Sequence, residues 1–127
     1  MDDTESKNID VEQENEDFDI IFLGGTRVCG KYFTDHLLKP VQKHKNCNAG
    51  AFAYMISKRG AQTIINKFEK DGIYKMYDHQ IRDYFPFMKV LYTNPPLVEH
   101  DFDIESDRLE AKYSKQYIEQ STKIDII

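Results

Sequence analysis

Two acidic tripeptides have a spacing that can bind a divalent cation. Asp17-Phe18-Asp19 and Asp101-Phe102-Asp103 each place two carboxylates one residue apart. Sugar-nucleotide transferases use such a pair to hold Mg²⁺ or Mn²⁺ on a diphosphate, because hard cations prefer oxygen ligands. That role requires a strand before the motif. The first tripeptide instead precedes an apolar run and the second follows an irregular segment, so solvated acidic turns are the simpler interpretation of both.

Four side chains of the types that bind zinc lie close together in the chain. They are Cys29, His36, His44 and Cys47. Their spacings match no standard zinc finger or knuckle. The alternative interpretation is therefore a set of unpaired surface or half-buried side chains.

Other titratable residues suggest acid-base chemistry or simple helix contacts. Asp78 begins a helical pattern, where a carboxylate can point into a cleft or act as the helix N-cap. His79 and Asp83 lie four residues apart and could pair on a helix surface. His100 stands among acidic residues, where a lone histidine is usually structural or exposed.

Three short apolar runs, residues 18–23, 49–56 and 89–93, are the predicted strands that would position these side chains. Gly24-Gly25 closes the first run. This glycine pair lacks the Lys and Ser/Thr of a P-loop and the third glycine of a dinucleotide-binding loop. Asn94-Pro95-Pro96 forces an extended or turned chain after the last run.

Helical spacing predicts three helices. The clearest follows Ser57, which we expect at or near its N-cap, and ends at Asp71-Gly72. The second spans residues 78–85 and stops at Pro86, and the third spans residues 108–120. Residues 26–48 have a weak pattern and are predicted to form a loop, with at most one short helix at residues 34–38.

Composition limits the class of protein. A chain of 127 residues has room for one hydrophobic core. Residues 1–16 are acidic and poor in large apolar side chains, and they are predicted to form a disordered leader. The basic clusters, Lys58-Arg59 and Lys43-His44-Lys45, are too brief to indicate nucleic-acid binding. No apolar run approaches the roughly twenty residues of a membrane span.

Localisation follows from the absence of a secretory signal. The chain does not open with a charged region followed by an apolar one. The cytoplasm is therefore the default expectation, and both cysteines are expected to be reduced.

Five segments, taken in chain order, resemble the second half of glycosyltransferase family 25. This family holds bacterial lipooligosaccharide galactosyltransferases and procollagen galactosyltransferases. The order of the five segments is more specific than any one segment. The strongest segment is Ala-Tyr-x-Ile-Ser-x-x-Gly-Ala at residues 53–61. The segments are residues 18–24, 50–61, 77–78, 94–98 and 106–107, with the landmark residues Gly50, Tyr54, Ser57, Gly60, Pro95, Pro96, Ser106 and Asp107.

The resemblance implies both a fold and a reaction. The fold is an α/β, Rossmann-like fold of the GT-A type with a mixed sheet and flanking helices. The reaction is an inverting transfer of galactose or glucose from a UDP-sugar to a glycan or protein hydroxyl, with Mn²⁺ on the diphosphate. Asp78 matches the acid of the family's Pro-(Ile/Val)-Asp segment and would contact the acceptor or act as the base. His100 is implied as a late ligand of the metal or diphosphate.

The chain also departs from the family pattern. In the family, the nucleotide-binding half and its acidic metal motif lie upstream of the segment that matches residues 18–24. We therefore expect a leader at residues 1–16, a family-like segment at residues 17–107 and a polar, helical tail at residues 108–127. Tyr77 also replaces the residue usually found before the family's acid.

Two hypotheses follow. The first is a truncated or inactive transferase whose missing half, including the donor and metal site, a protein partner could supply. The second is a non-catalytic interaction module, with exposed apolar surface on residues 20–23 and 51–56.

Overall fold

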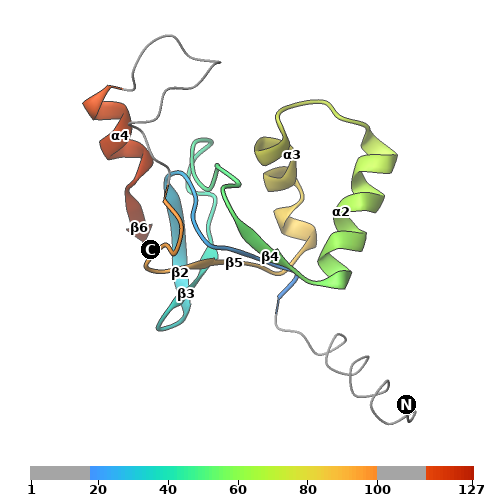
Figure 1. The fold of residues 1–127 in the computed structure, drawn as a ribbon, viewed down its shortest axis with the longest axis horizontal. Helices are drawn as coiled ribbons and strands as arrows, with labels where there is room; N and C mark the ends of the chain where they lie inside the picture. Colours follow the sequence, from blue (N-terminus) through green and yellow to red (C-terminus); the bar gives the residue numbers. More distant parts are fainter. Residues whose placement is uncertain (1–17, 100–113) are drawn as a thin grey trace.

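A single mixed β-sheet organises the protein. The computed structural model describes residues 18–99 and 114–127, and the six strands of these residues lie in the order β4-β1-β5-β3-β2-β6 (Figure 1). The expected α/β class with a mixed sheet and flanking helices is confirmed. The strands are β1 (Ile20–Phe22), β2 (Val28–Thr34), β3 (Leu37–Pro40), β4 (Tyr54–Ile56), β5 (Val90–Thr93) and β6 (Ile124–Ile126).

The sheet contains two parallel pairs of strands. β1 runs parallel to β5, and β2 runs parallel to β6, whereas the other neighbouring strands are antiparallel. Phe22 pairs with Tyr92 of β5 on one side and with Tyr54 of β4 on the other. The carboxyl ends of β1 and β5 therefore meet at one edge of the sheet, beside the start of β4.

The helices lie at opposite ends of the sheet. α2 (Lys58–Asp71) and α3 (Tyr77–Asp83) lie together near β4, and α4 (Lys115–Ser121) lies near β6 (Figure 1). A short 3₁₀ helix, η1 (Phe85–Phe87), follows α3. None of the helices in the described ranges has the length and apolar character to cross a membrane. The core joins side chains from the sheet, α2 and α3: Ile20, Phe22, Val28, Leu38, Ile64, Ile81, Val90 and Tyr92.

The prediction of a loop at residues 26–48 is wrong. Much of this segment is the β2–β3 hairpin, and a tight turn replaces the short helix expected at residues 34–38. Residues 28–30 are buried but residues 31–34 are all exposed, so the strand lacks an alternating pattern. Pairing with β6 on one side and β3 on the other stabilises β2, and neither partner is adjacent to residues 28–30 in sequence.

The other predicted elements are confirmed with changed boundaries. The strand expected at residues 49–56 is limited to Tyr54–Ile56. The helix expected at residues 78–85 ends at Asp83 and passes into η1. Within the described part of the expected tail helix, α4 begins at Lys115, and β6 adds a strand that we did not predict.

The buried carboxylate of Asp19 joins β1, β5 and α2. Asp19 is only 5% exposed. Its two carboxylate oxygens accept separately, one from the Arg59 guanidinium and the other from the backbone N–H of Lys89 at 2.8 Å. Its carbonyl oxygen accepts from the backbone N–H of Ser57 at 2.9 Å. Both earlier interpretations of this residue, a metal ligand and a solvated turn, are therefore wrong.

The start of α2 is built against the same residue. Ser57 is the N-cap, as predicted, and its hydroxyl accepts from the backbone N–H of Gly60 at 3.0 Å. A Cβ at position 60 would lie 2.2 Å from the carbonyl oxygen of Asp19, so only glycine allows this approach. Asp19, Ser57, Arg59 and Gly60 thus form a structural joint between β1 and α2, which we call the Asp19 joint.

We predict that Asp19→Ala destabilises the protein by about 3 kcal/mol. The substitution leaves the Lys89 N–H without its acceptor and the Arg59 guanidinium without its carboxylate. Urea denaturation followed by circular dichroism measures the loss. Glu69→Gln, an exposed change on α2, is the control and should cost less than about 0.5 kcal/mol. A loss below 1 kcal/mol for Asp19→Ala would show that the joint does not stabilise the fold.

Candidate functional site

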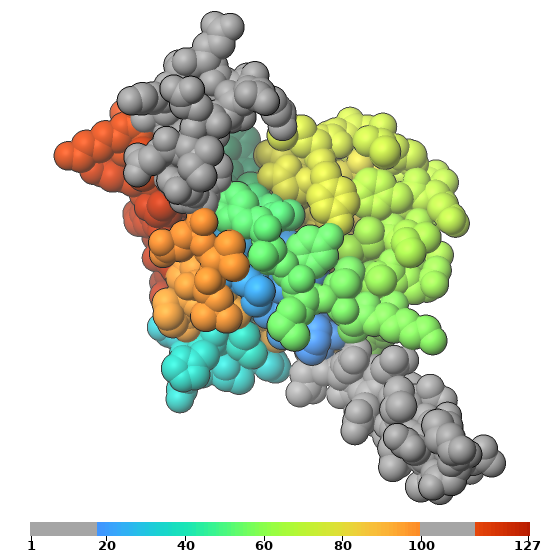
Figure 2. Space-filling model, in the orientation of Figure 1, coloured from blue at the N-terminus to red at the C-terminus, as the bar shows by residue number. Residues whose placement is uncertain are grey.

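The carboxyl edge of β1 and β5 brings separate sequence landmarks together. The carbonyl oxygen of Leu23 accepts from the backbone N–H groups of Leu97 and Val98 at 2.7 and 3.0 Å. Gly24 packs so closely on the carbonyl of Val98 that a Cβ would lie 2.0 Å from it. Figure 2 shows the segment after β5 (orange) lying against the segment around residue 50 (green). Residues 23–24 and 97–98 therefore lie together at this edge.

Asp78 reaches this edge from the first turn of α3. It is not the N-cap, because Met76 occupies that position and makes no side-chain cap. The Asp78 Oδ2 atom accepts from the backbone N–H of Gly50 at 3.0 Å, and Oδ1 accepts from the N–H of His79 at 3.0 Å. The side chain stays 23% exposed. Asp78 is thus a fixed carboxylate with access to solvent.

Gly50 connects Asp78 to the neighbouring loop. Its φ of 76° lies in the left-handed region that favours glycine. A Cβ here would lie 2.4 Å from Thr26 Oγ1 and 3.0 Å from the ring of Phe52. Any larger residue would therefore displace the N–H that Asp78 accepts.

Two tyrosine hydroxyls, from β4 and the start of α3, contact each other. The hydroxyl oxygens of Tyr54 and Tyr77 are 2.7 Å apart, and the ring of Tyr77 stacks on Phe68 at 6.0 Å between centroids. Burial, and then the hydrogen bond to Tyr54, raises the pKa of the Tyr77 hydroxyl above its ordinary value. The Tyr77 hydroxyl is therefore protonated at neutral pH and can donate or accept a hydrogen bond.

A small pocket opens at the same carboxyl edge. Its volume is about 340 Å³, at the lower end of the range for small-molecule sites. Sequence reasoning missed the part of this wall that comes from residues 121–124, because residues near the C-terminus carry no signal that they pack beside β2. The lining residues are Gly25, Thr26, Val28, Phe52, Pro96, Val98, Glu99, Ser121, Thr122 and Ile124.

The remaining predicted residues lie in different parts of the structure. Ser57 and Gly60 belong to the Asp19 joint, and Pro95 and Pro96 follow β5 at the carboxyl edge, where the Asn94-Pro95 peptide bond is cis. The predicted His79–Asp83 pair is wrong. His79 lies 3.1 Å from Arg82, whereas Asp83 pairs with Lys75 at 2.7 Å. His100, Ser106, Asp107 and the tripeptide 101–103 lie outside the described residues.

The environment of Asp83 is distinct from that of Asp78. Burial raises the pKa of Asp83, but hydrogen bonds from Lys75 and Tyr74 outweigh burial and hold the pKa below its ordinary value. Asp83 is exposed and lies outside the Gly50 contact. It is therefore a suitable comparison for Asp78 on the same helix.

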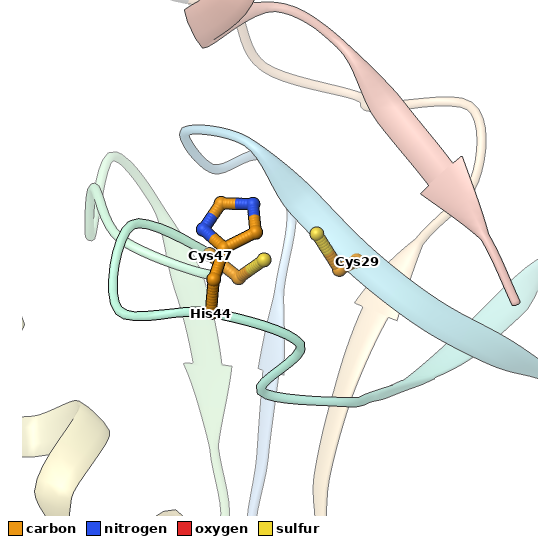
Figure 3. A group of neighbouring side chains, drawn as sticks. All are labelled: Cys29, His44 and Cys47. Atoms are coloured by element: carbon orange, nitrogen blue, oxygen red, sulfur yellow. The ribbon is translucent and has the colours of Figure 1, made fainter.

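Three of the four predicted zinc ligands lie together. The ligand atoms of Cys29, His44 and Cys47 are all within 4.8 Å of one another (Figure 3). His36 is not part of this group, because it lies in the exposed turn between β2 and β3. Both cysteines are free thiols and are buried, which corrects the interpretation of surface or half-buried side chains for this pair.

A larger groove lies elsewhere. Its volume is about 1010 Å³, and Lys39, Lys45, Lys75, Arg82 and Lys89 line it together with Asp83. Its charge would suit an anion. No buried polar group of the described chain points to a specific ligand there, so the smaller pocket is the better candidate site.

Comparisons with known proteins add no relative. No family model, no curated protein and no solved structure matches the chain. The function must therefore be inferred from the residues and their geometry.

We predict that Asp78→Ala destabilises the protein by about 2 kcal/mol. The change removes a charged acceptor from the partly buried N–H of Gly50. Asp83→Ala, on the same helix, breaks only exposed contacts with Lys75 and Tyr74 and should cost less than about 1 kcal/mol. Thermal unfolding of both variants measures the difference. Equal losses would mean that Asp78 does not anchor the Gly50 loop.

Proposed function

We propose that this protein is the acceptor side of a hexose-transferring enzyme of the glycosyltransferase family 25 type. The reaction would move galactose or glucose from a UDP-sugar to a glycan or protein hydroxyl. One observation carries the proposal. The carboxylate that aligns with the family's acid, Asp78, accepts the N–H of Gly50, another family landmark, at the carboxyl edge of β1 and β5. Ligands of open α/β sheets bind at such an edge.

Asp78 is suited to receive a hydroxyl. Each of its oxygens accepts one backbone N–H and retains capacity for a further hydrogen bond. The carboxylate is held in place but not enclosed. An acceptor hydroxyl could therefore donate to Asp78, and Asp78 could take its proton as the donor sugar leaves the diphosphate.

The surroundings of Asp78 suit a sugar. The tyrosine hydroxyls of Tyr54 and Tyr77 offer both donors and acceptors, and Phe52, 37% exposed, offers an aromatic surface. The neighbouring pocket mixes apolar walls with hydroxyls from Thr26, Ser121 and Thr122. A hexose has this combination of apolar faces and equatorial hydroxyls.

We assign the donor diphosphate and Mn²⁺ to residues outside the described ranges. Mn²⁺ prefers carboxylate oxygens. Within residues 18–99 and 114–127, the one group of three potential metal ligands is the Cys-His-Cys cluster, which contains no carboxylate. Asp19 is buried, and each of its oxygens already accepts a hydrogen bond from within the fold. A protein partner could supply the donor half, and His100 stays a predicted ligand on that side.

The proposal predicts that the protein binds hexosides through Asp78. Methyl β-galactoside and methyl β-glucoside should shift the amide NMR signals of Gly50 and His79, because both amides donate to Asp78. Asp78→Asn should weaken the binding about tenfold, which corresponds to one hydrogen bond to a charged group. Asp83→Asn should leave the affinity unchanged. The proposal would be contradicted if the hexoside-induced NMR shifts were the same in Asp78→Asn as in the wild type, or if no specific shift appeared.

A donor experiment distinguishes the two sides of the reaction. We expect that UDP with Mn²⁺ leaves the signals of the described residues unshifted. Tight, Mn²⁺-dependent binding of UDP at these residues would show that the donor site is present among them. The acceptor proposal and the donor assignment can therefore fail separately.

The alternative is a non-catalytic interaction module, and the exposed apolar surface available to it is smaller than expected. Ile20 and Phe22 are buried in the core, whereas Met55 and Ile56 of β4 are 54% and 38% exposed. Among the strands of residues 18–99 and 114–127, β4 is an edge strand that pairs with β1. Concentration-dependent self-association abolished by Met55→Lys would favour this alternative over sugar transfer.

A further inference from the structure

The buried side of the β2–β3 hairpin carries a second cluster of reactive groups. Cys29 lies in β2, and His44 and Cys47 lie in the loop that follows β3 (Figure 3). The two cysteines are 1% and 0% exposed, and His44 is half-buried. None of these residues takes part in the proposed sugar site.

A set of hydrogen bonds fixes the loop around the two sulfur atoms. The backbone N–H of Cys47 donates to the carbonyl of His44 at 3.1 Å, which places both side chains on one turn. The Gln42 side chain donates to the carbonyls of both residues at 2.7 and 2.8 Å. Arg82 of α3 donates to the Cys47 carbonyl at 2.8 Å. The geometry of the cluster is therefore set before any ligand arrives.

The loop is also tied to β2 on either side of Cys29. The Asn48 side chain accepts from the backbone N–H of Cys29 at 2.8 Å and donates to the carbonyl of Val41 at 3.1 Å. The N–H of Val41 donates to the carbonyl of Cys29 at 2.8 Å. Asn48 is itself buried. These contacts hold Cys29 opposite Cys47 although eighteen positions of sequence separate them.

We propose that Cys29, His44 and Cys47 bind one zinc ion, with a water molecule in the fourth position. Two thiolates and one imidazole form a known open zinc set. Tetrahedral Zn–S and Zn–N bonds require ligand atoms about 3.4–3.8 Å apart. Atoms already within 4.8 Å of one another need to move by about 1 Å at most to meet this requirement.

Charged groups of both signs lie beside the cluster, because the Arg27 guanidinium is 3.4 Å from His44 Nε2 and Asp125 lies near Cys29. Asp125 of β6 pairs with Cys29 in the sheet, and its Oδ2 lies 4.0 Å from the Cys29 sulfur, where it favours positive charge. Thiolate and imidazole ligands select zinc over the oxygen-seeking Mn²⁺. This site is therefore chemically distinct from a Mn²⁺–diphosphate site, and the two proposals are independent.

Zinc must displace protons from the thiols. Burial, and then the hydrogen bond with Cys47, raises the pKa of Cys29 to about 12. The metal-free Cys29 thiol is therefore protonated at neutral pH and is a poor nucleophile. Because thiols bind zinc as thiolates, binding releases protons, and the affinity for zinc should increase with pH.

The test is metal binding by the whole reduced protein after chelator treatment. We expect Co²⁺ to bind one per chain with thiolate-to-cobalt charge-transfer absorption, and Zn²⁺ to displace it. His44→Gln should weaken binding of both metals at least tenfold, on the scale of known perturbations of metal sites. His36→Gln, in the exposed turn, should leave binding unchanged. Bound metal should also protect both cysteines from alkylation.

Three results would overturn the zinc site. They are the absence of the charge-transfer band while both thiols are reduced, an equal affinity in His44→Gln and the wild type, and a Cys29–Cys47 disulfide in the protein as isolated. His44 lies in a half-buried loop and not in a strand. His44→Gln should therefore fold, and the test does not depend on variants of the buried cysteines.

Discussion

The ion pair between Asp19 and Arg59 is the interaction on which the arrangement of this protein depends. Asp19 precedes β1, Arg59 lies in the first turn of α2, and the Lys89 N–H that shares the carboxylate precedes β5. One buried carboxylate thus fixes the start of both parallel strands and the start of the main helix. A buried charge of this kind is tolerated only because each of its oxygens has a partner.

The Asp19 joint lies at the amino ends of β1 and β5, and it determines which residues meet at their carboxyl ends. With β1 and β5 held in register from Ile20 and Val90, both strands end beside Tyr54 and the Gly50 loop. Asp78 then meets Gly50 across this edge. The motif residues therefore divide by role: Ser57, Arg59 and Gly60 build the scaffold, whereas Gly50, Tyr54 and Asp78 lie at the carboxyl edge of β1 and β5.

Local signals in the sequence predicted the elements that local chemistry determines. The apolar runs at residues 18–23 and 89–93 and the Ser57 cap were predictable, because each depends on neighbouring residues. The β2–β3 hairpin was not, since β2 is stabilised by β3 and by the distant β6. Asp19 and the Cys29–Cys47 pair were misinterpreted for the same reason: their partners lie 40 and 18 positions away, and only the fold reveals them.

A crystal structure of the protein soaked with methyl β-galactoside would test the central claim, that Asp78 marks the acceptor side of a sugar site, most directly. We predict a hexose at the carboxyl edge of β1 and β5, with a sugar hydroxyl within hydrogen-bonding distance of the Asp78 carboxylate and the Gly50 contact intact. A hexose bound only in the basic groove, or an Asp78 that contacts no sugar at saturating ligand, would contradict the account.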